Sequence, residues 1–133
     1  MSKENVELVR AAFEALGEKG PEGVIGFFDP GIEWVVRADV PDSDTFRGHD
    51  GMRRLFASFD EVMEGIWYEP TELVDAGKQV VVPLRWGGRG KASGAAFEER
   101  EETWVFTLRE GKVTRVNEYA AKAAALEAVG LRE

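Results

Sequence analysis

Apolar residues recur at the spacing of α-helices in three segments of the N-terminal half of the chain. The pattern predicts helices over residues 2–16, 21–28 and 48–65, with apolar side chains three or four positions apart. Ser2 suits the start of the first helix, and glycines follow it from Gly17 onward. Each helix therefore carries one apolar face that needs a surface to pack against.

The rest of the chain changes to an alternation of apolar and polar residues, which is typical of strands. The alternation predicts strands over residues 32–36, 66–75, 79–89, 95–108 and 113–120, a short strand near Phe46, and a short terminal helix over 121–129. We find no repeat, linker or low-complexity tract. Residues 1–133 are thus expected to form one α+β domain, with helices on one face of a curved antiparallel sheet.

A tight hairpin is predicted at residues 108–112. A type I turn with Gly111 in the left-handed conformation would join the last two long strands through a three-residue loop. The register that follows places Phe106 opposite Thr114, Trp104 opposite Val116, and Glu102 opposite Glu118. Side chains alternate along a strand, so these residues share one face of the sheet.

A second hairpin brings an arginine to the same face. If Ser93 and Gly94 form a two-residue turn, Arg85 lies beside Glu102. A mostly apolar face made by Trp104, Phe106 and Val116 would then also carry a charged row. Such a face is typical of a pocket that binds a hydrophobic small molecule.

The charged row Arg85, Glu102 and Glu118 can perform acid/base chemistry. Opposed carboxylates beside an apolar wall raise one pKa toward the range of a general acid or base. Arg85 would hold the nearer carboxylate ionised. The alternative is a solvated charge ladder at an exposed strand end, with no chemical role.

An apolar row lies on the strand face opposite Arg85 in this register, at Val80, Val82, Leu84 and Trp86. A sheet with one solvated face should not expose four such residues. We therefore expect a homodimer in which a second subunit covers the outer face of the sheet.

Composition narrows the possible partners. Net charge is −8, which argues against nucleic acid and anionic membranes as partners. The chain has no cysteine and one histidine, so neither a disulfide nor a dedicated metal site is expected. The polar N-terminus is unlike a signal peptide and no apolar run is long enough to span a bilayer, so we expect a cytoplasmic protein.

Several segments carry a resemblance to a known family: residues 5–16, 28–34, 46–49 and 106–113, with Glu118-Tyr119 after them. In order and spacing they resemble the nuclear transport factor-2-like superfamily, and its SnoaL-like branch in particular. The resemblance implies a cone-shaped fold, with a strongly curved sheet of about six strands wrapped around three N-terminal helices. It also implies a pocket between sheet and helices. Members include ketosteroid isomerases, polyketide cyclases, limonene-epoxide hydrolases and non-catalytic proteins.

The resemblance to the ketosteroid isomerases is partial. Asp39 stands nine residues before Gly48, which matches the catalytic aspartate of those enzymes. Asp39 suits a plain loop role as well, since aspartate is common in turns. The two oxyanion-hole donors of the isomerases fall at Ala12 and Trp104, neither of which supplies the same group. Steroid isomerisation is therefore not expected.

The resemblance to the epoxide hydrolases and cyclases points to the last strand. Arg85 and Glu118 match the arginine and the last-strand acid of the hydrolases, whereas Gly87 replaces their second aspartate. Glu102 could take its place. The SnoaL-type cyclases also place an acid at the position of Glu118.

Two functions stay open on these grounds. The first is an enzyme without a cofactor or metal that isomerises, cyclises, dehydrates or hydrolyses a hydrophobic small molecule. Its expected catalytic residues are Glu118, Glu102, Arg85 and Asp39, with Trp104, Phe106 and Val116 binding the substrate. The second is a non-catalytic ligand-binding or dimerisation domain of the same fold.

Overall fold

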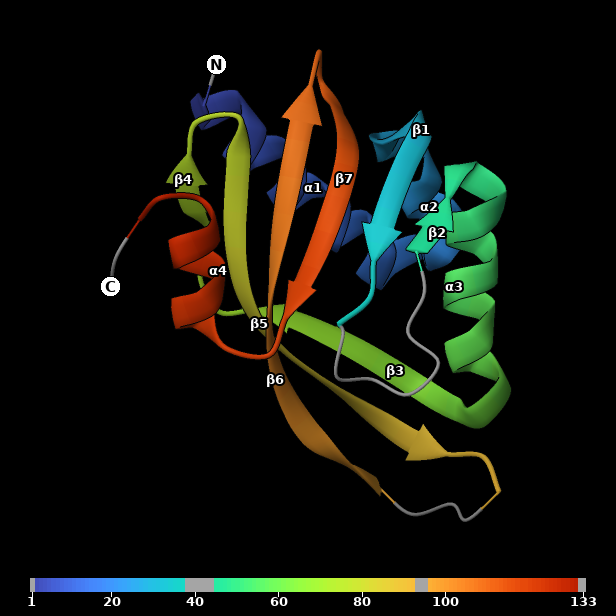
Figure 1. Cartoon of the computed structure of the whole chain (residues 1–133). Coiled ribbons are helices and arrows are strands. Elements are labelled where there is room, and N and C mark those ends of the chain that lie inside the picture. Colours follow the sequence, from blue (N-terminus) through green and yellow to red (C-terminus); the bar gives the residue numbers. More distant parts are fainter. Residues whose placement is uncertain (1, 38–44, 93–95, 132–133) are drawn as a thin grey trace.

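A computed structural model describes residues 2–37, 45–92 and 96–131 (Figure 1). The helices are α1 (Ser2–Lys19), α2 (Pro21–Val24), the 3-10 helix η1 (Ile25–Phe27), α3 (Gly48–Val62) and α4 (Lys122–Ala128). The strands are β1 (Phe28–Val35), β2 (Thr45–Arg47), β3 (Met63–Pro70), β4 (Val74–Ala76), β5 (Gln79–Gly90), β6 (Ala96–Arg109) and β7 (Lys112–Tyr119). The predicted α+β fold is confirmed. One difference is that the strand expected over residues 66–75 is divided into β3 and β4.

The strands form one sheet in the order β2-β1-β7-β6-β5-β3, and β4 pairs with β5 beyond the end of β3. Every pair is antiparallel except β1 with β7, which is parallel. The sheet is therefore mixed, not purely antiparallel as expected. The parallel pair brings the N-terminal strand β1 against the C-terminal strand β7.

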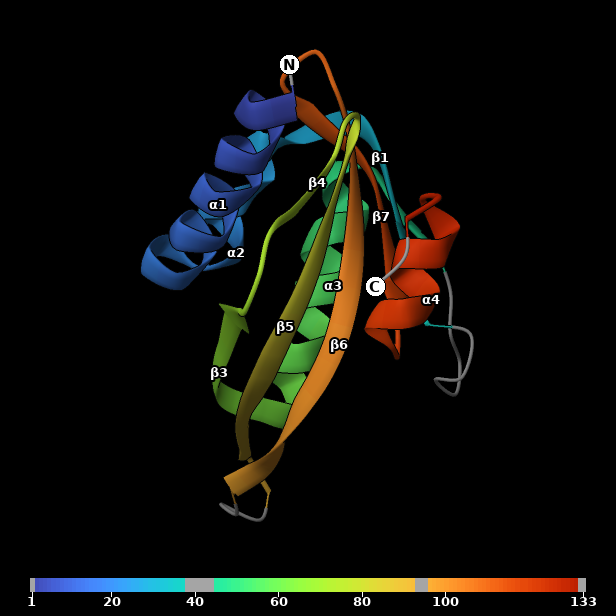
Figure 2. The same ribbon diagram turned by 90° about the vertical axis from the view of Figure 1, so that its left-hand side faces the viewer.

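The sheet curves around α1 and α3, and α4 lies on its other side (Figure 2). The main core fills the concave side and joins residues from α1, α3 and the strands, among them Val9, Met52 and Val82, each with no exposed surface. A smaller cluster lies under α4, where Ala125 and Leu126 cover Val81. Apolar residues are thus buried on both sides of the sheet, by α1 and α3 on one side and by α4 on the other.

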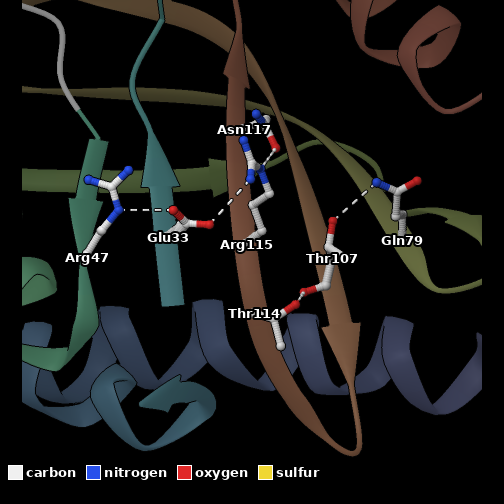
Figure 3. Close-up of polar contacts among 7 residues, drawn as sticks. All are labelled: Glu33, Arg47, Gln79, Thr107, Thr114, Arg115 and Asn117. Atoms are coloured by element: carbon white, nitrogen blue, oxygen red, sulfur yellow. Dashed lines mark hydrogen bonds and ion pairs between the residues drawn. The ribbon is translucent and has the colours of Figure 1, made fainter. Parts of the chain in front are cut away.

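The apolar row on β5 faces the concave side. Val80, Val82 and Leu84 belong to the main core and are at most 2% exposed, because α1 and α3 cover them. The expectation that a second subunit covers this row is wrong. On the convex side, Glu33 bridges Arg47 and Arg115 in a row of polar side chains (Figure 3).

The β6–β7 hairpin differs in detail from the expected turn. Its loop has two residues, Glu110 and Gly111, with φ of 50° and 76°, between the paired Arg109 and Lys112. A register shift follows at once, with Thr114 as the extra residue. Trp104 therefore lies opposite Glu118 and Phe106 opposite Val116, two residues from the predicted pairs. A shift by two keeps every side chain on its predicted face.

Candidate functional site

A cavity of about 350 Å³ lies between α3 and the concave face of the sheet. Its wall is mostly aromatic and aliphatic, and two carboxylates, two guanidinium groups and a phenol share it. The lining residues are Val36, Arg37, Phe46, Leu55, Ser58, Phe59, Tyr68, Trp86, Arg100, Glu102, Trp104 and Glu118. An apolar cavity with a few convergent polar groups is the usual form of a small-molecule site.

Glu118, near the end of β7, has a carboxyl group in this cavity. Its Oε2 accepts a hydrogen bond of 2.6 Å from the indole N–H of Trp34, and its Oε1 lies 3.4 Å from the backbone N–H donor of Arg37. Burial raises the pKa of Glu118 to about 7, the charge of Glu102 raises it too, and the Trp34 hydrogen bond opposes the rise. At neutral pH this carboxyl group can thus both take up and release a proton.

Glu102 is held more tightly and is 9% exposed. Its Oε1 accepts 2.9 Å from the indole N–H of Trp104, and its Oε2 accepts 2.9 Å from that of Trp86. The Arg37 guanidinium lies 3.7 Å from Oε2. Two indole donors and a guanidinium therefore hold this carboxyl group in place.

Tyr68 on β3 adds a phenol to the cavity. Burial raises its pKa, and the charges of Asp60, Glu118 and Glu102 raise it further. Its ring lies 5.8 Å from that of Trp104, centre to centre. The phenol therefore stays protonated at neutral pH and can donate a hydrogen bond to a bound oxygen.

Arg85 is not part of this cavity, so its predicted place beside Glu102 is wrong. Leu84 pairs with Glu102, and Arg85 pairs with Glu101 instead. A slip by one residue turns a side chain to the other face, where Arg85 contacts Glu69 at 2.9 Å. The guanidinium that contacts Glu102 is that of Arg37.

The predicted ligand-binding residues divide into two groups. Trp104 lines the cavity, as expected. Phe106 and Val116 share its face but pack in the core, at 3% and 0% exposure, and are not among the residues that line this cavity. Asp39 lies outside the described residues.

Among the site residues that were not predicted from the sequence are Trp34, Arg37, Tyr68 and Trp86. Tyr68 could have been predicted, because it lies two residues after Ile66 on the same face of β3 and directly opposite Trp86. Trp34 and Arg37 are brought to the site by the parallel pairing of β1 with β7, which no local pattern in the sequence indicates.

Neither a metal centre nor a membrane span is found in the part of the chain that the structure describes. No group of three or more histidine, cysteine or acidic residues there could hold a metal ion. None of the described helices is both long enough and apolar enough to cross a bilayer.

Comparison with known proteins agrees with the fold. An NTF2-like protein from Burkholderia xenovorans shares 33% identity with a TM-score of 0.70, covering 97% of this chain and 98% of that one. A protein with a ketosteroid isomerase-like fold from Catenulispora acidiphila, solved in complex with trimethylamine, shares 22% identity with a TM-score of 0.74, covering 94% of this chain and 93% of that one. A SnoaL-like polyketide cyclase described as putative, from Jannaschia sp., shares 19% with a TM-score of 0.76, covering 99% and 95%.

No curated protein matches the chain in sequence. The model of the SnoaL-like domain family matches residues 9–116, which is most of the chain. The resemblance found in the sequence is confirmed, and the chain belongs to the SnoaL-like family, with the NTF2-like fold.

Proposed function

We propose that this protein is an enzyme without a cofactor that moves a proton within a hydrophobic small molecule. The observation that carries the proposal is the state of Glu118, a half-buried carboxyl group in the cavity, with a pKa raised to about 7. General acids and bases work best when their pKa lies near the working pH. Glu118 is thus the proposed proton carrier.

The proposed step begins with a carbonyl compound whose acidic C–H bond faces Glu118. The carboxylate takes the proton, and the electron pair of the broken C–H bond moves to the carbonyl oxygen as an enolate. Tyr68 donates a hydrogen bond to that oxygen, which stabilises the charge where it develops. Where a C=C bond stands next to the acidic carbon, the charge extends over it as a dienolate, and protonated Glu118 returns the proton to the far carbon of that bond while the C=C bond moves into conjugation with the carbonyl. Without such a bond the proton returns to the carbon that lost it, and atoms and charge balance in both cases.

Glu102 has a different proposed role, because two indoles and Arg37 already hold it. The charge of Glu102 raises the pKa of Glu118, which makes Glu118 the stronger base. Two acidic groups in one cavity with different environments divide the work in this way. Cyclisation, dehydration and hydrolysis also need a proton carrier, so the same pair would serve them.

A second candidate is a ligand-binding domain without catalysis. The observation that favours it is that both carboxylates already have indole donors, Trp34 for Glu118 and Trp86 with Trp104 for Glu102. Such a pocket would hold a ligand and exchange no proton with it.

With either function, the homodimer remains a prediction, which light scattering at micromolar protein concentration tests.

Deuterium exchange separates the two candidates without knowledge of the substrate. The protein is incubated in D2O with a panel of hydrophobic ketones such as 2-tetralone, and loss of the acidic C–H signals is followed by proton NMR. We expect exchange faster than in buffer for at least one ketone. Glu118→Gln should abolish the acceleration, because an amide cannot accept the proton.

Glu33→Gln is the matched control, since Glu33 is an acid of the convex face, paired with Arg47 and Arg115 (Figure 3). It should leave exchange unchanged. Ketones that bind without accelerated exchange would support the second candidate. Acceleration that survives in Glu118→Gln would contradict the role of Glu118.

A further inference from the structure

The two carboxyl oxygens of Glu118 have different hydrogen-bond partners. Oε2 accepts a bond of 2.6 Å from the indole N–H of Trp34, whereas Oε1 has a longer contact, 3.4 Å from the backbone N–H of Arg37. An indole N–H is a donor and never an acceptor, so the oxygen that it contacts must offer a lone pair. The two oxygens are therefore not equivalent as sites for a proton.

The indole of Trp34 has little freedom to turn. Trp34 is 3% exposed, and its ring packs edge-to-face at centroid distances of 5.0 to 6.5 Å against the rings of Phe28, Phe56, Trp104 and Phe106. Strand β1 also lies beside β7, which places Trp34 opposite Val116, two residues before Glu118 (Figure 1). Packing in the core thus sets the direction of the indole N–H.

The contacts of the two oxygens also differ in where they lie. Arg37, whose backbone N–H is near Oε1, lines the cavity together with Glu118, whereas Trp34 is not among the residues that line it. The Trp34 hydrogen bond therefore holds Oε2 toward the core and leaves Oε1 on the side of the cavity. A C–H bond of a ligand can approach Oε1 without displacing the indole N–H.

The same contacts favour one oxygen as the site of the proton. In a carboxylic acid the carbonyl oxygen accepts hydrogen bonds better than the hydroxyl oxygen. A proton on Oε1 leaves the indole N–H on the carbonyl oxygen, whereas a proton on Oε2 would leave it facing the weaker acceptor. A bond of 2.6 Å is short for an N–H donor, which fits the better acceptor.

We infer that Trp34 is a positioning residue that makes Oε1 of Glu118 the oxygen that takes up and returns the proton. What the proton is exchanged with rests on the proposed function. In that step Oε1 forms an O–H bond as the substrate C–H bond breaks, and the electron pair moves to the carbonyl oxygen. Oε1 then gives the proton back to a carbon of the enolate, while Oε2 keeps the hydrogen bond from Trp34.

Infrared spectroscopy tests without a substrate which oxygen carries the proton. At pH 5.5 Glu118 is protonated, and its C=O stretch is the band that Glu118→Gln removes. A hydrogen bond to a carbonyl oxygen lowers the frequency of this stretch, so Trp34→Phe should raise it. Trp67→Phe is the matched control, because Trp67 is 39% exposed and does not line this cavity. A band that stays in place in Trp34→Phe would overturn the inference.

A second measurement needs only the wild-type protein, and it decides the matter where Trp34→Phe does not fold. The indole N–H resonance of Trp34 is followed by NMR through the titration of Glu118. It should stay at the low-field position of a hydrogen-bonded N–H from pH 5.5 to pH 8.5. Movement to the position of a free indole N–H at pH 5.5 would overturn the inference, because the proton would then be on Oε2.

Deuterium exchange separates positioning from an effect on the pKa alone. Loss of the Trp34 donor should raise the pKa of Glu118, which by itself makes the ionised carboxylate a stronger base. The other ionisable groups that face Glu118, namely Glu102, Arg37 and Tyr68, are unchanged in Trp34→Phe.

At pH 9 Glu118 is ionised in both proteins. Exchange at saturating ketone should nevertheless be at least about fivefold slower in Trp34→Phe, with KM unchanged, because the carboxylate is less firmly oriented. An equal or faster rate at pH 9 would overturn the positioning role. If the wild type exchanges no ketone, the proposed function fails, while the infrared and NMR results still decide which oxygen binds the proton.

Discussion

The indole N–H of Trp34 donates a 2.6 Å hydrogen bond to Glu118 across 84 positions of sequence. The contact exists because β1 and β7 pair in parallel, with Trp34 opposite Val116. Trp34 is 3% exposed, and the hydrogen bond is partly buried. A short bond from a neutral donor stabilises the ionised carboxylate against burial, which favours the neutral acid.

Trp34→Phe removes this donor and keeps most of the aromatic volume. The pKa of Glu118 should rise above its value of about 7, by about one unit, because a hydrogen bond to a charged group is worth about 1.5 kcal/mol or more. Carboxyl carbon NMR of labelled protein measures the titration. A midpoint that stays in place or falls would contradict the role given to Trp34.

Glu102→Gln should move the same titration the other way. The charge of Glu102 raises the pKa of Glu118, so a neutral amide at residue 102 lowers it. The change also leaves Arg37 without this carboxylate partner, which adds to the fall. Glu101→Gln is the matched control one position along β6, on the other face of the strand. It should leave the Glu118 midpoint unchanged.

The two arginines give a direct test of the β5–β6 register. The Arg37 guanidinium lowers the pKa of Glu118, so Arg37→Gln should raise it. Arg85→Gln should leave it unchanged, because Arg85 contacts Glu69 on the opposite face. The Arg85–Glu69 pair is well exposed, so its loss should cost less than about 1 kcal/mol of unfolding free energy. If only Arg85→Gln changed the pKa of Glu118, the register expected from the sequence would be the correct one.

Glu118 also makes folding stability depend on pH. Its pKa is about 7 in the folded protein and 4.5 as a reference for the unfolded chain, so between these values the folded state binds more protons. The contribution of Glu118 to the unfolding free energy therefore falls as pH rises from 4.5 to 7, by up to about 3 kcal/mol, and is constant above.

Glu118→Gln removes this titration. The variant should unfold at higher denaturant concentration than wild type at pH 8, and the difference should shrink toward pH 5. Urea unfolding at several pH values measures it. Glu33→Gln serves again as the surface control. Equal unfolding midpoints of wild type and Glu118→Gln at every pH would contradict the raised pKa of Glu118.

The backbone geometry of the β6–β7 turn indicates that a substitution there, far from the site, should stabilise the protein. Glu110 has φ of 50°, an unfavourable value for glutamate, and Gly111 follows with 76°. Two-residue turns with both φ positive favour Asn-Gly, so Glu110→Asn should add about 0.5 to 1 kcal/mol of stability. Gly111→Ala should lose about 1 kcal/mol at the same turn. Thermal unfolding of the two variants measures both changes in stability, and the prediction requires that they have opposite signs.

The hairpins show why the site was only partly predictable. Gly111 was placed correctly in the left-handed region, yet the loop is one residue shorter than expected and a bulge at Thr114 follows. The two deviations add to a slip of two, so Glu102 and Glu118 kept their predicted face. On β5 the slip beside Glu102 is one residue, which sent Arg85 to the other face.

The order and type of nearly all the elements could be predicted from the chain alone, since helical and strand spacing are local properties. The same alternation predicted that Trp104, Glu102 and Glu118 share a face. The cation that joins them could not be predicted, because Arg37 reaches Glu102 through the parallel pairing of β1 with β7. Strand register and pairing depend on bulges and on contacts between distant segments, and local spacing does not specify either.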